Sequence, residues 1–211
     1  MRKCKTGLGA ALRMAAAALV LTLVTGASAH AHHVMGGQTP ETLVQGLLSG
    51  FGHPVIGIDH LAFIVAMGVA VGVAGLSLAL PAVFIVVSAL GVALHVRGIT
   101  LPAAEFIIAA TVLIAGVVLA SGRAMRAWGW AVLFAVAGLF HGYAFGESIF
   151  GAEPTPLVAY LAGLAIVQAA LATGVALIAR HSGAGAVSTR LAGATVAGIG
   201  IAILAGQLIP P

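Results

Sequence analysis

The stretch GHPVIGIDHLAFIVAM, residues 52–67, places two histidines and an aspartate inside an otherwise apolar segment. Pro54 suits the first turn of a helix, where its missing N–H costs nothing, so the stretch predicts a helix that begins near His53. At about 3.6 residues per turn, His53 and His60 then fall on one stripe, and Asp59 faces the same side as His60. For His53 alone, a role as helix cap is an equally good explanation.

Composition decides the class of protein around this stretch. The chain of 211 residues is 61% hydrophobic and only 7% charged, whereas a soluble domain carries about 25% charged residues. The sequence therefore predicts an all-α polytopic membrane protein, whose 29 glycines serve close helix contacts. An ionisable residue such as Asp59 at membrane depth costs on the order of 3 kcal/mol unless it is paired, which makes it a candidate functional residue.

The first residues have the pattern of a secretory signal peptide. A basic start precedes an apolar run from about residue 14 to 24, and the small residues of ASA, 27–29, form a cleavage site. We predict cleavage after residue 29; cleavage after Ala31 and an uncleaved first anchor are the alternatives. The predicted organisation is a signal peptide at 1–29, a periplasmic histidine-containing segment at 30–52 and a transmembrane domain at 53–211.

Charge excludes a nucleic-acid partner. Four of the nine basic residues precede residue 14, so the chain after residue 29 has five basic and five acidic residues and no net charge. It lacks the basic patch that phosphates require. The single cysteine, Cys4, lies in the signal peptide, so the mature chain can form neither a disulfide nor a thiolate metal site.

The apolar segments predict a bundle of six transmembrane helices in contact with the lipid bilayer. Turn signals separate spans at 55–76, 80–97, 101–121, 127–146, 156–179 and 189–209. With an exported start, four of the five remaining arginines fall in cytoplasmic loops, as the positive-inside rule requires. We therefore predict a protein of the cytoplasmic membrane with both mature termini in the periplasm.

This topology brings ionisable residues from four helices to the outer membrane face. They are His53, Asp59, His60, His95, Glu105, His141 and Glu147. Four imidazoles and three carboxylates are a suitable ligand set for a borderline divalent cation. Ahead of the bundle, the new N-terminus His30-Ala-His32-His33 could capture Ni(II) or Cu(II) through a square-planar set of nitrogens, or could be a solvated tail.

Other polar residues in the spans have local explanations. Thr111 is expected to bond to its own helix. Tyr160 fits an aromatic belt at the membrane interface. Gln168, in the middle of the fifth predicted span, either lines a path or joins two helices.

The motif His53-Pro-x-x-Gly-x-Asp59-His60, with the signal peptide and six spans, resembles the HupE/UreJ family of nickel and cobalt permeases. Leu101-Pro-x-x-Glu105 and Phe140-His141-Gly-Tyr followed by Glu147 are similar to the family's later motifs. Two departures are Gln168, where relatives often have a histidine, and His95, which matches no general motif.

The resemblance implies import of Ni(II) or Co(II) as cargo, with no prosthetic group and no enzyme activity. It implies functional roles for His53, Asp59, His60, His141 and Glu147. It also leaves open a homo-oligomer and partners in metalloenzyme maturation.

Two other functions are compatible with buried histidines and acids. One is an intramembrane metalloenzyme with zinc bound by His, Asp and Glu, although the chain has no HExxH motif. The other is a structural or sensory subunit with a proton relay.

Overall fold

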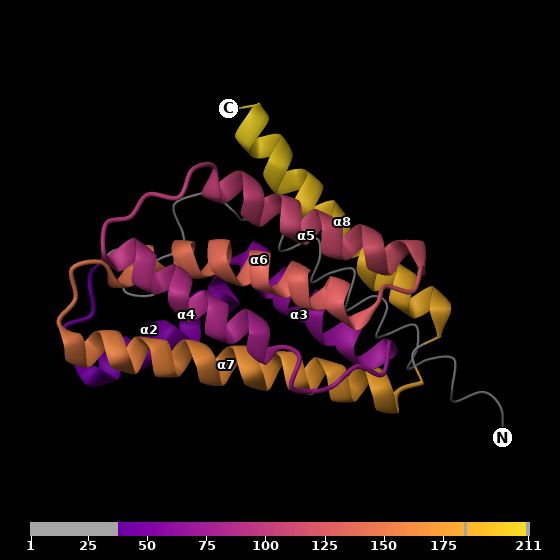
Figure 1. Ribbon diagram of the computed structural model, residues 1–211, viewed down its shortest axis with the longest axis horizontal. Coiled ribbons are helices and arrows are strands. Elements are labelled where there is room, and N and C mark those ends of the chain that lie inside the picture. The colour runs from indigo at the N-terminus through magenta and orange to yellow at the C-terminus, as the bar shows by residue number, and fades with distance from the viewer. Residues whose placement is uncertain (1–37, 184, 210–211) are drawn as a thin grey trace, which may run out of the picture. The chain divides into compact units, whose positions relative to one another are not determined.

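A computed structural model describes residues 38–183 and 185–209 (Figure 1). Within these residues all regular structure is helical, which confirms the all-α part of the predicted fold class. The elements are α2 (Leu43–Ile56), α3 (Ile58–Val73), α4 (Ala82–Val96), α5 (Ala104–Ser121), α6 (Ala127–Phe145), the 3-10 helix η1 (Gly146–Ile149), α7 (Pro154–His181) and α8 (Ala186–Leu208). The predicted signal peptide lies outside the described residues.

Helix length supports a multi-pass membrane protein but not all six predicted spans. Four segments of the described chain are long and apolar enough to cross a bilayer: α5, α6 with η1, α7 and α8. The bent pair α2 and α3 makes a fifth if it is counted as one span. The predicted span at 80–97 contains α4, whose 15 residues extend only about 22 Å at 1.5 Å per residue.

The helix predicted to begin at Pro54 begins elsewhere. Thr42 caps α2, and its side chain and that of Gln45 form a reciprocal capping box, so the helix starts more than ten residues earlier. Pro54 therefore lies in the last turns of α2. The predicted domain boundary at residue 53 also falls inside this helix.

The chain breaks at Gly57 instead, and α3 leaves at 78° to α2. Gly57 has an extended conformation, with φ −70° and ψ 110°. A Cβ atom there would lie 2.5 Å from Cδ2 of His60 and 3.2 Å from Oδ1 of Asp59. A residue without a side chain is needed because these two side chains fold back against the break.

Glycines bring three helix pairs into close contact and show their relative directions. A Cβ on any of these glycines would lie within 3.0 Å of a backbone atom in the partner helix. In α3, Gly68 and Gly72 meet Ala172 and Ala176 of α7, and in α6, Gly138 and Gly142 meet Phe84 and Ser88 of α4. Gly116 of α5 meets Ala197 of α8, and Gly200 of α8 meets Leu113 of α5. The first two pairs run in the same direction and the third in opposite directions. These directions agree with the alternating course predicted for the chain.

An aromatic core fills the space between α3, α4 and α6. Phe63 stacks on Phe84 with ring centroids 5.4 Å apart, and Phe134 meets Phe63 edge to face at 6.2 Å. All three side chains are fully buried. The ring of His141 lies on this core, 5.1 Å from the ring of Phe63, so the core supports the site described next.

Candidate functional site

Three histidine rings stand in series where the break between α2 and α3 faces the end of α6. The ring centroids of His53 and His60 are 5.6 Å apart, and those of His60 and His141 are 5.0 Å apart. All three side chains are buried. The break thus allows His53, at the end of one helix, and His60, at the start of the next, to meet a residue far along the chain.

Hydroxyl groups of η1 and α7 hold His53 in place. Its Nδ1 lies 2.9 Å from Oγ of Ser148 and 2.9 Å from the hydroxyl oxygen of Tyr160. That hydroxyl donates its hydrogen to the carbonyl oxygen of Phe145 at 2.7 Å. A carbonyl oxygen can only accept, so the Tyr160 oxygen accepts from Nδ1–H of His53. Neutral His53 therefore carries its lone pair on Nε2.

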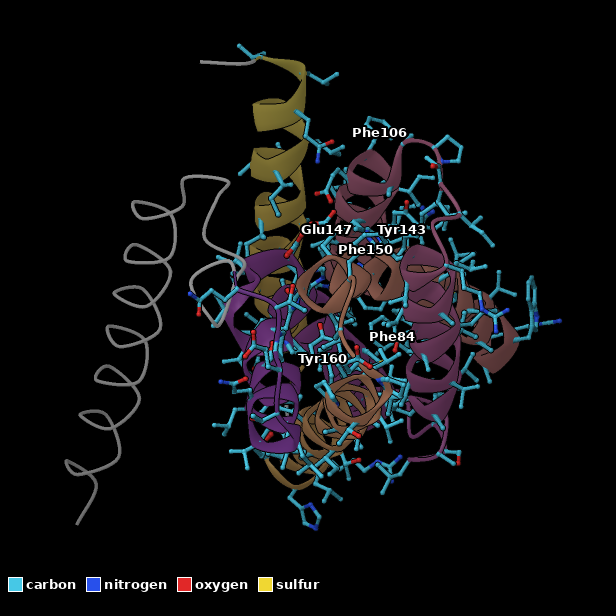
Figure 2. The ribbon with its side chains drawn as sticks, turned by 90° about the vertical axis from the view of Figure 1, so that its left-hand side faces the viewer. Phe84, Phe106, Tyr143, Glu147, Phe150 and Tyr160 are labelled. Atoms are coloured by element: carbon cyan, nitrogen blue, oxygen red, sulfur yellow. The ribbon has the colours of Figure 1, made fainter. Side chains whose placement is uncertain are left out.

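Figure 2 shows how this part of the site is arranged. In this view Glu147 and Phe150 lie close together near the end of α6, and Tyr160 lies below them, toward α7. Tyr160 is fully buried, so its interpretation as a residue of the interfacial aromatic belt is wrong. Its position near the end of a span gave no sign of the histidine that it contacts from another helix.

Asp59 lies in the first turn of α3 and is buried. Its Oδ1 accepts a hydrogen bond from the backbone N–H of His60 at 2.8 Å and lies 3.9 Å from Nδ1 of the His60 ring. The positive end of a helix dipole stabilises a carboxylate in this position. The sequence prediction that Asp59 faces the same space as His60 is confirmed.

His141 connects this cluster to α5. Its Nδ1 lies 2.8 Å from Nδ1 of His60, and its Nε2 lies 3.1 Å from Oγ1 of Thr111. Thr111 also donates to the carbonyl oxygen of Ile108 at 2.7 Å. The predicted bond of Thr111 to its own helix is therefore present, and the contact with His141 is one that the sequence analysis did not foresee.

The other predicted ligands lie at helix ends. Glu105, in the first turn of α5, and Glu147, in η1, are exposed. His95, at the end of α4, packs against the rings of Tyr143 at 4.6 Å and Phe150 at 5.8 Å. Among the described residues, its buried Nδ1 has no hydrogen-bond partner.

The structure therefore brings together four of the seven predicted groups: His53, Asp59, His60 and His141. Within the described part of the chain, no three His, Cys, Asp or Glu side chains are already arranged to hold a metal ion. His30 and His32 lie outside the described residues, so the predicted capture site at the N-terminus stays a prediction.

Sequence comparison identifies the family. Residues 18–203, most of the chain, match the family described as "HupE / UreJ protein". The chain belongs to the HupE/UreJ family. It is also similar to Protein HupE of Rhizobium leguminosarum bv. viciae, with 34% identity over 164 residues, which cover 76% of this chain and 85% of that protein. No solved structure matches the chain.

The HupE/UreJ family is generally related to nickel and cobalt transport. Membership and the apolar helices together establish a multi-pass membrane protein of a transporter family. Neither match supports the zinc metalloenzyme alternative. Of the positions carried over from the family resemblance, His53, Asp59, His60 and His141 lie in the buried cluster, and Glu147 directly precedes Ser148, which contacts His53.

Gln168, where HupE/UreJ relatives were expected to carry a histidine, lies deeper along α7 and is fully buried. Oγ of Ser88 donates to the carbonyl oxygen of Ile85 at 2.9 Å and lies 3.3 Å from Oε1 of Gln168, a contact that joins α7 to α4. Its Nε2 has no hydrogen-bond partner among the described residues. Of the two predicted roles of Gln168, lining a path or joining two helices, the contact with Ser88 supports the second.

Proposed function

We propose that this protein is a permease that imports Ni(II), or Co(II), across the cytoplasmic membrane through the cluster of His53, Asp59, His60 and His141. The observation that carries the proposal is a buried set of three imidazoles and one carboxylate at a helix break, in a multi-pass member of this family. Imidazole and carboxylate suit a borderline divalent ion. Buried ionisable groups at membrane depth are retained for function, since they are costly for stability.

The helix break supports transport in particular. Transporters place ion sites at discontinuous helices, whose ends present backbone dipoles to the cargo. Here α2 ends and α3 begins at the cluster, and Asp59 adds a negative charge in the first turn of α3. An arriving hydrated ion would exchange water for side-chain ligands that bind well enough to select it and weakly enough to release it.

The driving force is proposed to be the membrane potential, an ion gradient or another subunit. The chain contains no GxxxxGK[ST] motif for ATP. A divalent cation that moves inward gains about 4.6 kcal/mol per 100 mV, twice the value for a single charge. The proposed orientation, with both mature termini periplasmic, has the ion enter at the end of the bundle that holds the cluster.

Uptake of radioactive Ni(II) and Co(II) by cells that express the protein tests this function. Asp59→Asn and His60→Ala should each reduce uptake at least about 10-fold at equal membrane levels, since even residues that only support a ligand contribute that much. His181→Ala is the matched control, because His181 is exposed and its hydrogen bond within the described residues is local, to the carbonyl oxygen of Leu177. Uptake that survives both substitutions in the cluster would refute the proposal.

A further inference from the structure

We propose that Thr111 is a positioning residue of the metal site: through His141, it fixes which ring nitrogen of His60 carries the lone pair. The proposal rests on the proposed function, because a lone pair matters here as a ligand for the metal ion. Thr111 belongs to α5, and among the described residues its hydroxyl contacts Ile108 of its own helix and His141 of α6. Its effect on His60 is therefore transmitted by the ring of His141.

The first step concerns the hydrogen of the threonine hydroxyl. Oγ1 of Thr111 lies 2.7 Å from the carbonyl oxygen of Ile108, and only the hydroxyl can donate in that pair. Its single hydrogen is used there. At 3.1 Å from Nε2 of His141, the same oxygen must therefore accept. Nε2 of His141 carries a hydrogen.

The second step passes to His60. A neutral His141 with hydrogen on Nε2 has its lone pair on Nδ1. That Nδ1 lies 2.8 Å from Nδ1 of His60, so His60 must donate, and its hydrogen is on Nδ1. The lone pair of neutral His60 is then on Nε2.

An independent contact favours the same form of His60. Oδ1 of Asp59 lies 3.9 Å from Nδ1 of His60. A carboxylate near this nitrogen favours an N–H over a lone pair, because the negative charge attracts the hydrogen and repels the lone pair. His53 reaches the same form by its own route, with Nδ1–H donated to Tyr160. Both histidines of the first motif therefore carry the lone pair on Nε2.

Loss of the threonine hydroxyl would reverse the positions of the ring hydrogens on His141 and His60. Without the Thr111 oxygen, Nε2–H of His141 loses its acceptor in a fully buried position. Moving that hydrogen to Nδ1 makes His141 the donor, and Nδ1 of His60 must then accept. The lone pair of His60 would then be on Nδ1, directed at the Nδ1–H of His141. Nε2 of His60 would carry the hydrogen and could not bind a metal.

The test compares Thr111→Val, which keeps the shape and removes the hydroxyl, with Thr111→Ser, which keeps the hydroxyl. Thr195→Val is the matched control, because Thr195 also bonds back to its own helix, at Leu191, and lies exposed on α8. Uptake is measured against the concentration of Ni(II). We expect the KM of Thr111→Val to rise about 10- to 100-fold, as for other residues that orient a ligand, while Thr111→Ser and Thr195→Val stay close to wild type.

A second measurement determines which ring nitrogen of His60 carries the hydrogen. Nitrogen NMR of purified, metal-free protein labelled with 15N-histidine should show hydrogen on Nδ1 of His60 in the wild type and on Nε2 in Thr111→Val. The His60 signals are assigned by their loss in His60→Ala. Wild-type His60 with its hydrogen on Nε2 overturns the inference, and this result needs no variant of Thr111 to fold.

Failure of the inference and failure of the proposed function are distinguishable. If the wild type takes up Ni(II) and Thr111→Val has the same KM, the role of Thr111 is refuted and the proposed permease function is unaffected. A wild type that transports neither metal overturns the permease function and, with it, the role of Thr111 in transport, whereas the NMR measurement still decides whether the threonine controls the His60 hydrogen.

Discussion

Gly142→Ala tests a close approach of two helices in the bundle. Gly142 of α6 faces Ser88 of α4, and a Cβ on Gly142 would lie 2.5 Å from Cα of Ser88 and closer still to its carbonyl oxygen. Ordinary contact begins at about 3.5 Å. Both partner atoms belong to the backbone, so no side-chain rotation relieves the clash. The two helices must move apart by roughly 1 Å, or the glycine region of α6 must bend.

The expected cost has a structural and a functional part. Overpacking of this kind destabilises a protein by about 1–3 kcal/mol. The displacement also shifts His141, the preceding residue, relative to His60 of α3. Their Nδ1 atoms are 2.8 Å apart, and a shift of roughly 1 Å takes them beyond hydrogen-bond distance. We therefore expect Gly142→Ala to lower both the thermal stability and the rate of metal uptake.

The matched control is Gly174→Ala in α7. A Cβ on Gly174 meets nothing within 4 Å, and alanine is preferred over glycine inside a helix by about 0.5–1 kcal/mol. Thermal unfolding of both variants and the wild type in one detergent gives the comparison, and uptake is normalised to the amount in the membrane. If Gly142→Ala is as stable as Gly174→Ala and transports like the wild type, the close contact of α4 and α6 is wrong.

Two further substitutions test buried polar contacts. Tyr160→Phe removes the hydroxyl that accepts a hydrogen bond from His53 and donates one to Phe145. We expect a higher KM for Ni(II) uptake and a loss of about 0.5–1.5 kcal/mol in the free energy of unfolding. An unchanged KM would show that His53 does not depend on this contact. Gln168→Leu removes an amide whose Nε2 has no partner among the described residues. The unfolding temperature of Gln168→Leu should be unchanged or higher, since an unsatisfied buried donor costs about 1–3 kcal/mol. Metal uptake should persist. A loss of uptake at normal stability would place Gln168 on the ion path instead.

The sequence predicted the membrane class and the core of the site for separate reasons. A chain with so few charges cannot be a soluble domain, and charge that persists in such a chain indicates function. That argument led to His53, Asp59, His60 and His141, which the structure brings together. It also included Glu105 and Glu147, which are exposed at helix ends and whose roles stay predictions.

The helix break was not predicted because two local signals compete near residue 54. Proline is common at the start of a helix, but the capping box of Thr42 and Gln45 starts α2 earlier and leaves Pro54 near its end. The roles of Thr111 and Tyr160 were missed for a different reason. Each has a sufficient explanation within its own helix or at the interface, and its partner histidine depends on the packing of helices far apart in the sequence.

The short helices around the cluster affect the solvation of the cargo. The helices α2, α3 and α4 have 14, 16 and 15 residues, or about 21–24 Å each, against a hydrocarbon core of about 30 Å. Lipid next to a short helix thins, or polar headgroups and water reach inward to meet its ends. The stretch over which the ion must travel without its hydration shell is then shorter than the full bilayer. The dehydration of a divalent cation is the main barrier to its entry into hydrocarbon. For the proposed metal cargo, short helices beside the histidines would lower that barrier.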